Sequence, residues 1–249
     1  MALDLNNFFD KKIESEVKIF NKSKRKKIYD PVTNFDKNFE KFIRLEIKKK
    51  FKDDSIDGEE FKLFKRTSDY LWIVDPIDGT KKFINNLPTW SNLIGLSYNN
   101  KFVLGLANFP ELKKFYISDH KNSYIFQHKF KKKILKLKKT NNKKIKVCIN
   151  FHHKFSKTKK DFLISKLKNI IFLNSYDALS YCLLTEGKVD AVIEANLKSY
   201  DIAPLIPIIK NAGGFVSNWK NKSPNNGGNI LATSNKKLHN KLFNILKFL

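Results

Sequence analysis

The chain has 249 residues, of which 41% are hydrophobic and 13% aromatic. This length and apolar content suit one large domain or two small, closely packed lobes, and they exclude an intrinsically disordered chain. The formal net charge is +25, from 49 Lys and Arg against 24 Asp and Glu.

The basic charge has two interpretations. A nucleic acid or an acidic membrane surface would attract such a chain. However, the lysines are spread along the whole chain beside many asparagines, and the arginines, which read bases and phosphates better, are confined to Arg25, Arg44 and Arg66. We therefore favour a lysine-rich composition over nucleic-acid binding. The positive field would still draw a phosphorylated ligand toward a site.

Helical spacing of apolar side chains predicts two helices near the N-terminus, over residues 3–28 and 35–51. Residues 70–74 are a short apolar run, rich in β-formers, that predicts a buried strand ending at Asp75. Further strands are predicted at 91–98, 102–108, 114–118 and 123–127. The middle of the chain is therefore predicted to be an antiparallel sheet.

Residues 128–146 are crowded with lysines between aliphatic side chains. This pattern fits a nucleic-acid-binding arm or an edge hairpin that lysines protect from aggregation, and we favour the hairpin. Beyond it the pattern alternates between strands and helices. The predicted strands are 147–150, 170–173 and 191–194, and the predicted helices are 156–168, 177–186, 201–211 and 235–248.

Cys148 and Cys182 lie within apolar runs, which predicts buried thiols. Residues 1–9 carry acids and no long apolar stretch, so no signal peptide is expected. Since no segment approaches ~18 consecutive apolar residues, no membrane span is expected either. The sequence predicts a soluble cytoplasmic protein.

Asp75 and Asp78 are placed at the end of the predicted strand, with a proline between them. This arrangement directs two carboxylates at one point, and hard cations such as Mg²⁺ prefer such oxygen ligands. Gly79 and Thr80 follow, and their backbone N–H groups could hold phosphate oxygens if a helix or turn begins there. Taken alone, the motif would favour a solvated Asp-Gly turn over a metal site.

Two further acidic motifs have similarly ordinary alternatives. Residues 57–60, Asp-Gly-Glu-Glu, would pass as a surface loop, and Asp201 would pass as the N-cap of an apolar helix. His152 and His153 lie in a basic, aromatic stretch that we interpret as surface or edge structure.

Together these motifs resemble the inositol monophosphatase superfamily, in the same order and over roughly residues 8–245. The segments that carry the resemblance are 58–60, 72–83, 200–203 and 212–214. Within that superfamily the C-terminal half most resembles the bacterial histidinol-phosphatases. The segments that point there are 87–94, 177–184, 187–190, 194–201 and 204–209.

The resemblance implies an α+β fold, a layered αβαβα sandwich with an N-terminal lobe over 1–140 and a C-terminal lobe over 141–249. It also implies a homodimer and two or three Mg²⁺ per active site. The implied metal ligands are Glu59, Asp75, the Ile77 carbonyl, Asp78 and Asp201. Gly79 and Thr80 would bind the phosphate through backbone N–H groups.

The Thr80 hydroxyl, with Asp36 or Glu59, would orient and deprotonate the attacking water. Asp177 and Glu194 fall where the superfamily contacts the leaving group, although Asp177 also fits a helix N-cap. Phe35 and Tyr176 depart from the family pattern, which has small residues there. Residues 25–27 lie near the position of a family lysine close to the metals.

The implied activity is Mg²⁺-dependent hydrolysis of L-histidinol phosphate to L-histidinol and phosphate by metal-activated water, in histidine biosynthesis. Metal ions that neutralise the phosphate and align the water remove the need for a covalent nucleophile. A related phosphatase acting on inositol phosphate, fructose bisphosphate or a 3′-phosphoadenosine nucleotide remains open. A polyanion-binding protein on a degenerate phosphatase fold also remains open.

Overall fold

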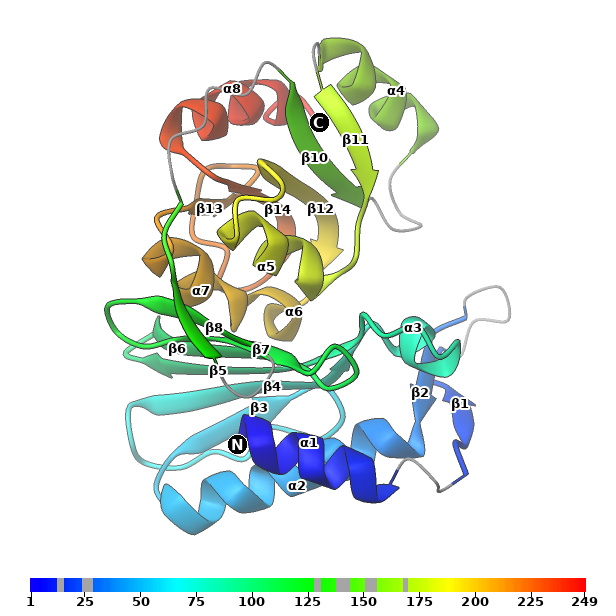
Figure 1. The fold of residues 1–249 in the computed structure, drawn as a ribbon, viewed down its shortest axis with the longest axis vertical. Coiled ribbons are helices and arrows are strands. Elements are labelled where there is room, and N and C mark those ends of the chain that lie inside the picture. The colour runs from blue at the N-terminus through cyan, green and yellow to red at the C-terminus, as the bar shows by residue number, and fades with distance from the viewer. Residues whose placement is uncertain (13–15, 24–28, 128–130, 138–143, 151–155, 168–169) are drawn as a thin grey trace.

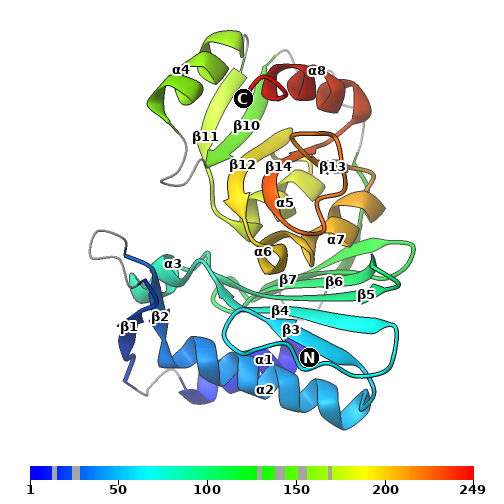
Figure 2. The same ribbon diagram turned by 180° about the vertical axis from the view of Figure 1, so that it is seen from behind.

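A computed structural model describes the chain except for residues 13–15, 24–28, 128–130, 138–143, 151–155 and 168–169. Its elements stack in five layers, helix, sheet, helix, sheet, helix (Figure 1). The opposite view shows the same stacking (Figure 2). The predicted αβαβα sandwich is therefore confirmed. The predicted lobe boundary at 140–141 lies within the undescribed residues 138–143 and stays a prediction.

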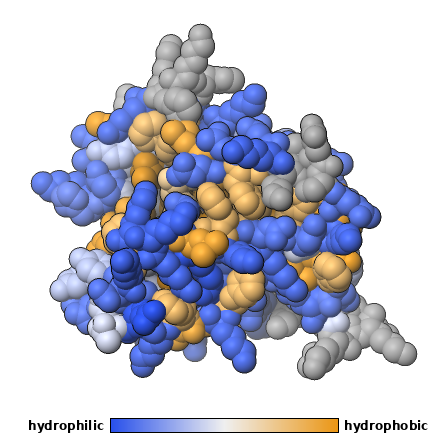
Figure 3. All heavy atoms as spheres, turned by 90° about the horizontal axis from the view of Figure 1, so that it is seen from below, coloured by the Kyte–Doolittle hydropathy of each residue, from blue (hydrophilic) through white to orange (hydrophobic). Residues whose placement is uncertain are grey.

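The first layer consists of α1 (Ala2–Lys12) and α2 (Asn34–Lys50), which cover one face of a seven-stranded sheet. In spatial order the sheet contains β3 (Ser55–Gly58), β4 (Tyr70–Asp78), β5 (Ser91–Tyr98), β6 (Lys101–Phe109), β7 (Lys114–Ser118), β8 (Ser123–Gln127) and β9 (Lys131–Leu135). In this sheet β3 and β4 pair in parallel, and the other neighbouring described strands pair antiparallel. Seen from below, the outer face mixes hydrophilic side chains with smaller hydrophobic areas (Figure 3).

The predicted helix over 3–28 agrees with α1 up to Lys12 but is wrong over the described residues 16–23. Residues Ile19–Asn21 form a strand, β1, that pairs antiparallel with β2 (Pro31–Thr33). Ile19 and Phe20 are 46% and 52% exposed, so their helical spacing reflects no buried face. Pairing with β2 satisfies the backbone instead, a choice that the apolar pattern alone does not reveal. The strands β2 and β3 were not predicted.

The second sheet has the order β11 (Ile170–Asn174), β10 (Ile145–Asn150), β12 (Ala191–Leu197), β14 (Gly228–Thr233) and β13 (Phe215–Asn218). Side chains alternate between its faces, as a period of two requires. Val147 and Ile193 pack outward with α4 (Lys157–Lys166) and α8 (Lys236–Leu246). Cys148 and Val192 pack inward. The strands β13 and β14 were not predicted.

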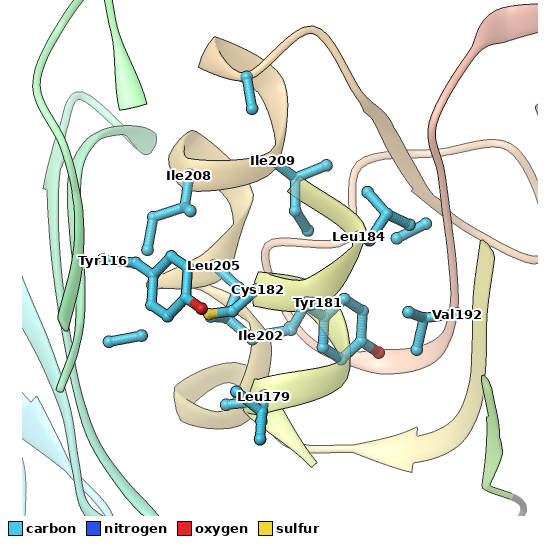
Figure 4. Close-up of a cluster of buried hydrophobic side chains, with 14 of the residues drawn as sticks. Tyr116, Leu179, Tyr181, Cys182, Leu184, Val192, Ile202, Leu205, Ile208 and Ile209 are labelled. Atoms are coloured by element: carbon cyan, nitrogen blue, oxygen red, sulfur yellow. The ribbon is translucent and has the colours of Figure 1, made fainter. Parts of the chain in front are cut away.

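The middle layer contains α5 (Ala178–Thr185), α6 (Ser199–Ile202) and α7 (Leu205–Asn211). The structure divides the predicted helix 201–211 into α6 and α7, with Pro204 between them. Their side chains meet Tyr116 of the first sheet and Val192 of the second (Figure 4). Both cysteines are buried and unpaired with each other, as predicted.

The middle layer touches the seven-stranded sheet where two glycines face each other. Gly95 of β5 and Gly105 of β6 are register partners. A Cβ atom at Gly105 would overlap the carbonyl oxygen of Pro204, and one at Gly95 would lie 3.2 Å from the Pro204 Cα. Because the two glycines have no side chains, the segment between α6 and α7 packs directly against the backbone of the sheet. This contact sets the distance between α6 and the sheet.

The predicted edge hairpin over 128–146 is described only in part: residues 131–135 form the edge strand β9, whereas Ile145 and Lys146 belong to β10 of the second sheet. β9 pairs only with β8 among the described strands, with Leu135 buried and Ile134 about half exposed. Within the described residues, no helix combines the length and the apolar character needed to cross a membrane.

Candidate active site

A β-bulge brings Asp75 and Asp78 to the same side of β4. Residues three apart in a regular strand point to opposite faces. Between Asp75 and Asp78, however, the pairing with β5 shifts by one residue, since Asp75 faces Leu93 and Asp78 faces Ser91. The extra residue reverses the alternation. The backbone N–H of Ile77 donates to Asp75 Oδ1 at 3.1 Å and fixes the turn.

Asp201 of α6 completes an acidic cluster at the end of β4. One carboxylate oxygen from each of Asp75, Asp78 and Asp201 lies within 4.8 Å of the other two. Hard divalent cations bind such convergent oxygen ligands. Two layers thus contribute to one potential cation site, because β4 belongs to the seven-stranded sheet and α6 to the helical layer above it.

The predicted site residues gather around one cavity of about 280 Å³. All of them except Asp36 line it: Glu59, Asp75, Ile77, Asp78, Gly79, Thr80, Asp177, Glu194 and Asp201. Six lining residues were not predicted as site residues: Asp30, Pro31, Lys81, Ala178, Tyr181 and Leu197.

Burial of like charges dominates the electrostatics of this cavity. Burial, reinforced by neighbouring carboxylates, raises the pKa of Asp75 and of Asp78 well above the usual range. Burial and the charge of Glu59 also raise the pKa of Asp201 to about 7, against a hydrogen bond from the Lys198 backbone. Such a cluster is costly unless cations or protons neutralise it. The donors therefore fit one or more divalent cations.

Asp36 lies behind Thr80 at the start of α2. The Thr80 hydroxyl lies 3.2 Å from Asp36 Oδ1 and 3.2 Å from the Ile77 carbonyl oxygen. The Thr33 backbone N–H and hydroxyl each donate to Asp36 Oδ2 at 2.6 Å. Burial nevertheless raises the pKa of Asp36 to about 6. Phe35, the departure from the family pattern, is accommodated against the ring of Phe83.

Gly79 and Thr80 begin a short helix, α3 (Thr80–Ile84). Gly79 has φ of 82°, a left-handed conformation that favours glycine. A Cβ atom there would also lie 3.0 Å from Asp177 Oδ2. Both the conformation and the close approach of Asp177 require glycine at this turn.

Lys22 is a site residue that sequence reasoning missed. Its ammonium lies 2.7 Å from Glu59 Oε1 and also pairs with Glu60. Burial alone would lower the pKa of Lys22, but the two carboxylates outweigh it and raise this pKa. The lysine follows β1, a strand that the sequence did not predict. The segment 25–27, where a family lysine was sought, lies outside the described residues, as do His152 and His153.

Glu194 lies on β12 and lines the cavity. It is 2% exposed and accepts hydrogen bonds from the Ser175 hydroxyl at 2.5 Å and the Tyr181 hydroxyl at 3.0 Å. Burial raises the pKa of Glu194 to about 7.

Asp177 occupies the N-cap position of α5, but its side chain makes no capping hydrogen bond. The backbone N–H of Ala178 donates instead to Asp78 Oδ2 at 2.9 Å. The Asp177 carboxylate lies 2.7 Å from the Lys82 ammonium, which also lies 5.7 Å from the centre of the Tyr176 ring. This ion pair could not be predicted, because the two residues are distant in the chain.

Comparison with known proteins agrees with this geometry. The chain matches the inositol monophosphatase family over residues 5–249. It is 33% identical to the chloroplastic bifunctional phosphatase IMPL2 of Arabidopsis thaliana over 77% of this chain and 56% of that protein, just over half its length. It is 27% identical to a histidinol-phosphatase of Chlorobaculum parvum over 85% of this chain and 82% of that one.

Among solved structures, the extragenic suppressor protein SuhB of Bartonella henselae superposes with a TM-score of 0.82. That likeness covers 99% of this chain and 94% of the SuhB chain at 22% identity, so it speaks for the fold alone. The family match spans both sheets and includes every residue around the acidic cluster. With this coverage, the chain belongs to the inositol monophosphatase family of phosphatases.

Proposed function

We propose that the protein is a Mg²⁺-dependent phosphomonoesterase that hydrolyses L-histidinol phosphate to L-histidinol and phosphate, a step of histidine biosynthesis. The observation that carries the phosphatase chemistry is the convergence of Asp75, Asp78 and Asp201 beside Gly79 and Thr80. A phosphate monoester is an anion, and a site of this kind can bind it only together with cations.

Glu59, Asp75, Asp78, Asp201 and the Ile77 carbonyl would hold two or three Mg²⁺. When bound, these ions neutralise the charge of the phosphoryl group as Lewis acids. The backbone N–H groups of Gly79 and Thr80 would orient the phosphate. Because Asp36 Oδ1 lies 3.2 Å from the Thr80 hydroxyl, Thr80 Oγ1 can take a proton from the attacking water and pass its own to Asp36. Glu59 is the alternative acceptor.

Asp177 and Glu194 would recognise the leaving group. L-Histidinol phosphate carries a primary ammonium, and the carboxylates of Asp177 and Glu194, which line the cavity, suit a cation. The Chlorobaculum relative, a histidinol-phosphatase, supports this substrate. The hydrogen bonds that Glu194 accepts from Ser175 and Tyr181 come from neutral hydroxyls, which leave its charge unpaired by them. Glu194 is therefore a stronger candidate than Asp177 to bind the ammonium.

The ion pair between Lys82 and Asp177 favours a second candidate. Lys82 already offsets the charge of Asp177, which weakens the case for a cationic leaving group. A polyol phosphate such as inositol phosphate, or fructose bisphosphate, needs no such charge. We retain this sibling activity as the alternative.

A phosphate-release panel with Mg²⁺ decides between these substrates. We expect the highest kcat/KM for L-histidinol phosphate, measured beside inositol 1-phosphate, fructose 1,6-bisphosphate and 3′-phosphoadenosine 5′-phosphate. A higher kcat/KM for inositol 1-phosphate would contradict the histidinol assignment but not the phosphatase chemistry. Absence of turnover with steeply salt-dependent nucleic-acid binding would instead support a polyanion-binding protein. The homodimer and the cytoplasmic location stay predictions.

A further inference from the structure

A polar stripe runs along the buried face of α2. Asp36, Glu40 and Arg44 recur at four-residue spacing, which places them on one side of a helix. They are 0%, 0% and 7% exposed, among buried phenylalanine and isoleucine side chains. A buried carboxylate and guanidinium are costly unless their hydrogen bonds are satisfied, so their partners indicate what the stripe does.

Glu40 binds the backbone of the loop that carries Glu59. Its Oε2 accepts the N–H of Glu60 at 2.7 Å, and its Oε1 accepts the N–H of Phe61 at 3.2 Å. Arg44 Nε donates to the same Oε1 at 2.8 Å. Both carboxylate oxygens therefore accept hydrogen bonds.

Arg44 donates hydrogen bonds to the backbone before and after Glu59. Its terminal nitrogens donate to the carbonyl oxygens of Ile56, at 3.3 Å, and of Phe61, at 2.9 Å. The planar guanidinium suits such a fork of acceptors better than a lysine would. Glu40 and Arg44 thus hold the backbone on both sides of Glu59.

Gly58 allows this close approach. A Cβ atom at Gly58 would overlap the Glu40 carboxylate, so any larger residue would push the loop away from α2. The glycine before Glu59 is therefore explained by the buried acid beneath it.

We propose that Glu40 and Arg44 are positioning residues for Glu59 as a metal ligand, a role that rests on the proposed Mg²⁺ site. The same helix holds Asp36 against Thr80. Helix α2 consequently sets the Glu59 carboxylate and the Thr80 hydroxyl relative to each other across the cavity, through the contacts of one stripe.

The test is the affinity for Mg²⁺, measured by calorimetric titration of the metal alone. Glu40→Gln replaces one acceptor oxygen by an NH₂ group that opposes a donor. Supporting side chains around metal ligands change metal affinity by roughly 10–100-fold, and we expect a loss of about tenfold. The Mg²⁺ concentration for half-maximal activity should rise in parallel, with the substrate KM at saturating Mg²⁺ nearly unchanged.

Asp54→Asn is the matched control. Asp54 is a buried acid of the same lobe that accepts hydrogen bonds from the Ser68 hydroxyl at 2.7 Å and the Trp72 indole at 2.8 Å, and it does not line the cavity. This variant should lose thermal stability but keep wild-type Mg²⁺ affinity. An equal loss of Mg²⁺ affinity in Glu40→Gln and Asp54→Asn would show that Glu40 has only a structural role.

Arg44→Lys is the milder second variant in case Glu40→Gln fails to fold. It keeps the charge but loses the fork to the two carbonyls, and we expect a fall in Mg²⁺ affinity of roughly threefold or more. Unchanged Mg²⁺ affinity in a folded variant, beside an active wild type, would overturn the positioning role alone. A wild type without Mg²⁺-dependent phosphate release would instead contradict the proposed function.

Discussion

At the residue scale, the site is made of buried polar groups whose partners come from elsewhere in the chain. The acids Asp75, Asp78 and Asp201 could be predicted because their motifs are specific. Lys22 and Lys82 could not, since 49 basic residues give any one lysine no distinguishing signal. Their roles arise from ion pairs that form only after folding.

Asp78→Asn should abolish Mg²⁺-dependent phosphate release while leaving the protein folded. The amide removes a charge that the proposed metal needs, yet its oxygen can still accept the N–H of Ala178. We expect activity to fall by roughly a thousandfold or more, on the scale of lost electrostatic stabilisation in other enzymes. Phosphate-release kinetics and circular dichroism check this. A folded variant with full activity would contradict the metal site.

His239 should make stability depend on pH. It is 3% exposed and lies between the hydroxyls of Ser217, at 2.9 Å, and Thr233, at 3.1 Å. Burial lowers the pKa of His239 to about 4, whereas an unfolded histidine titrates near 6.5. The unfolded chain therefore binds the proton first, and this residue's contribution to stability is lost as pH falls from about 6.5 to about 4.

The comparison of wild type with His239→Gln isolates this contribution. Site carboxylates with raised pKa values act in the opposite direction, but they do so in both proteins. Between pH 7 and 5 the free energy of unfolding should fall by roughly 1 kcal/mol more in the wild type. Urea unfolding at both pH values measures this difference, and equal pH dependence would argue against a neutral buried His239.

At the element scale, periodicity predicted the elements that bury one regular face. Helix α2 and strands β5 to β8 agree closely with their predicted bounds, because their apolar side chains repeat at the period of the element. Strand β1 was mistaken for helix because its stability depends on pairing with β2. The bulge in β4 was also invisible in the sequence, although it directs Asp75 and Asp78 to one side.

Gly105→Ala should lower both stability and activity, because it disturbs the contact between β6 and the segment that joins α6 to α7. The added Cβ would overlap the Pro204 carbonyl and push α7 and α6 away from the sheet. We expect a loss of about 1–3 kcal/mol, typical of overpacking, and lower activity because Asp201 moves with α6. Thermal unfolding and phosphate release measure the two effects.

Gly95→Ala provides the graded control. It adds the same methyl group to the neighbouring strand, where the nearest Pro204 atom would lie 3.2 Å away. Its effects should be smaller than those of Gly105→Ala. Equal or reversed effects would show that contact with Pro204 does not set the position of α6.

At the scale of the whole molecule, the candidate metal site joins the seven-stranded sheet to the helical layer above it. Asp75 and Asp78 come from the seven-stranded sheet, and Asp201 comes from the helices between the sheets. A cation held by all three would therefore stabilise the contact between layers as well as bind substrate. Without a cation, the same carboxylates repel one another.

Adding Mg²⁺ to metal-free protein should consequently raise the Tm. A ligand at 100 times its Kd stabilises the folded state by about 2.7 kcal/mol when it binds only that state. Differential scanning calorimetry with EDTA and with Mg²⁺ measures the shift. In Asp78→Asn the Mg²⁺-dependent shift should shrink, while the metal-free protein should gain stability from the lost repulsion. An unchanged Mg²⁺ shift in that variant would place the metal elsewhere.

The sequence by itself determined the family, the layered fold and the acidic residues of the candidate site, because motifs such as Asp75–Thr80 and regular apolar periods are local in the chain. Only the tertiary structure decided which charges face one another. Distant segments are joined by two ion pairs, Lys22–Glu59 and Lys82–Asp177. They are also joined by the hydrogen bonds of Glu40 and Arg44 to the backbone of the Glu59 loop. Such contacts depend on how the layers pack against one another. The spacing of residues along the chain does not predict that packing, because the contacting segments are far apart in sequence.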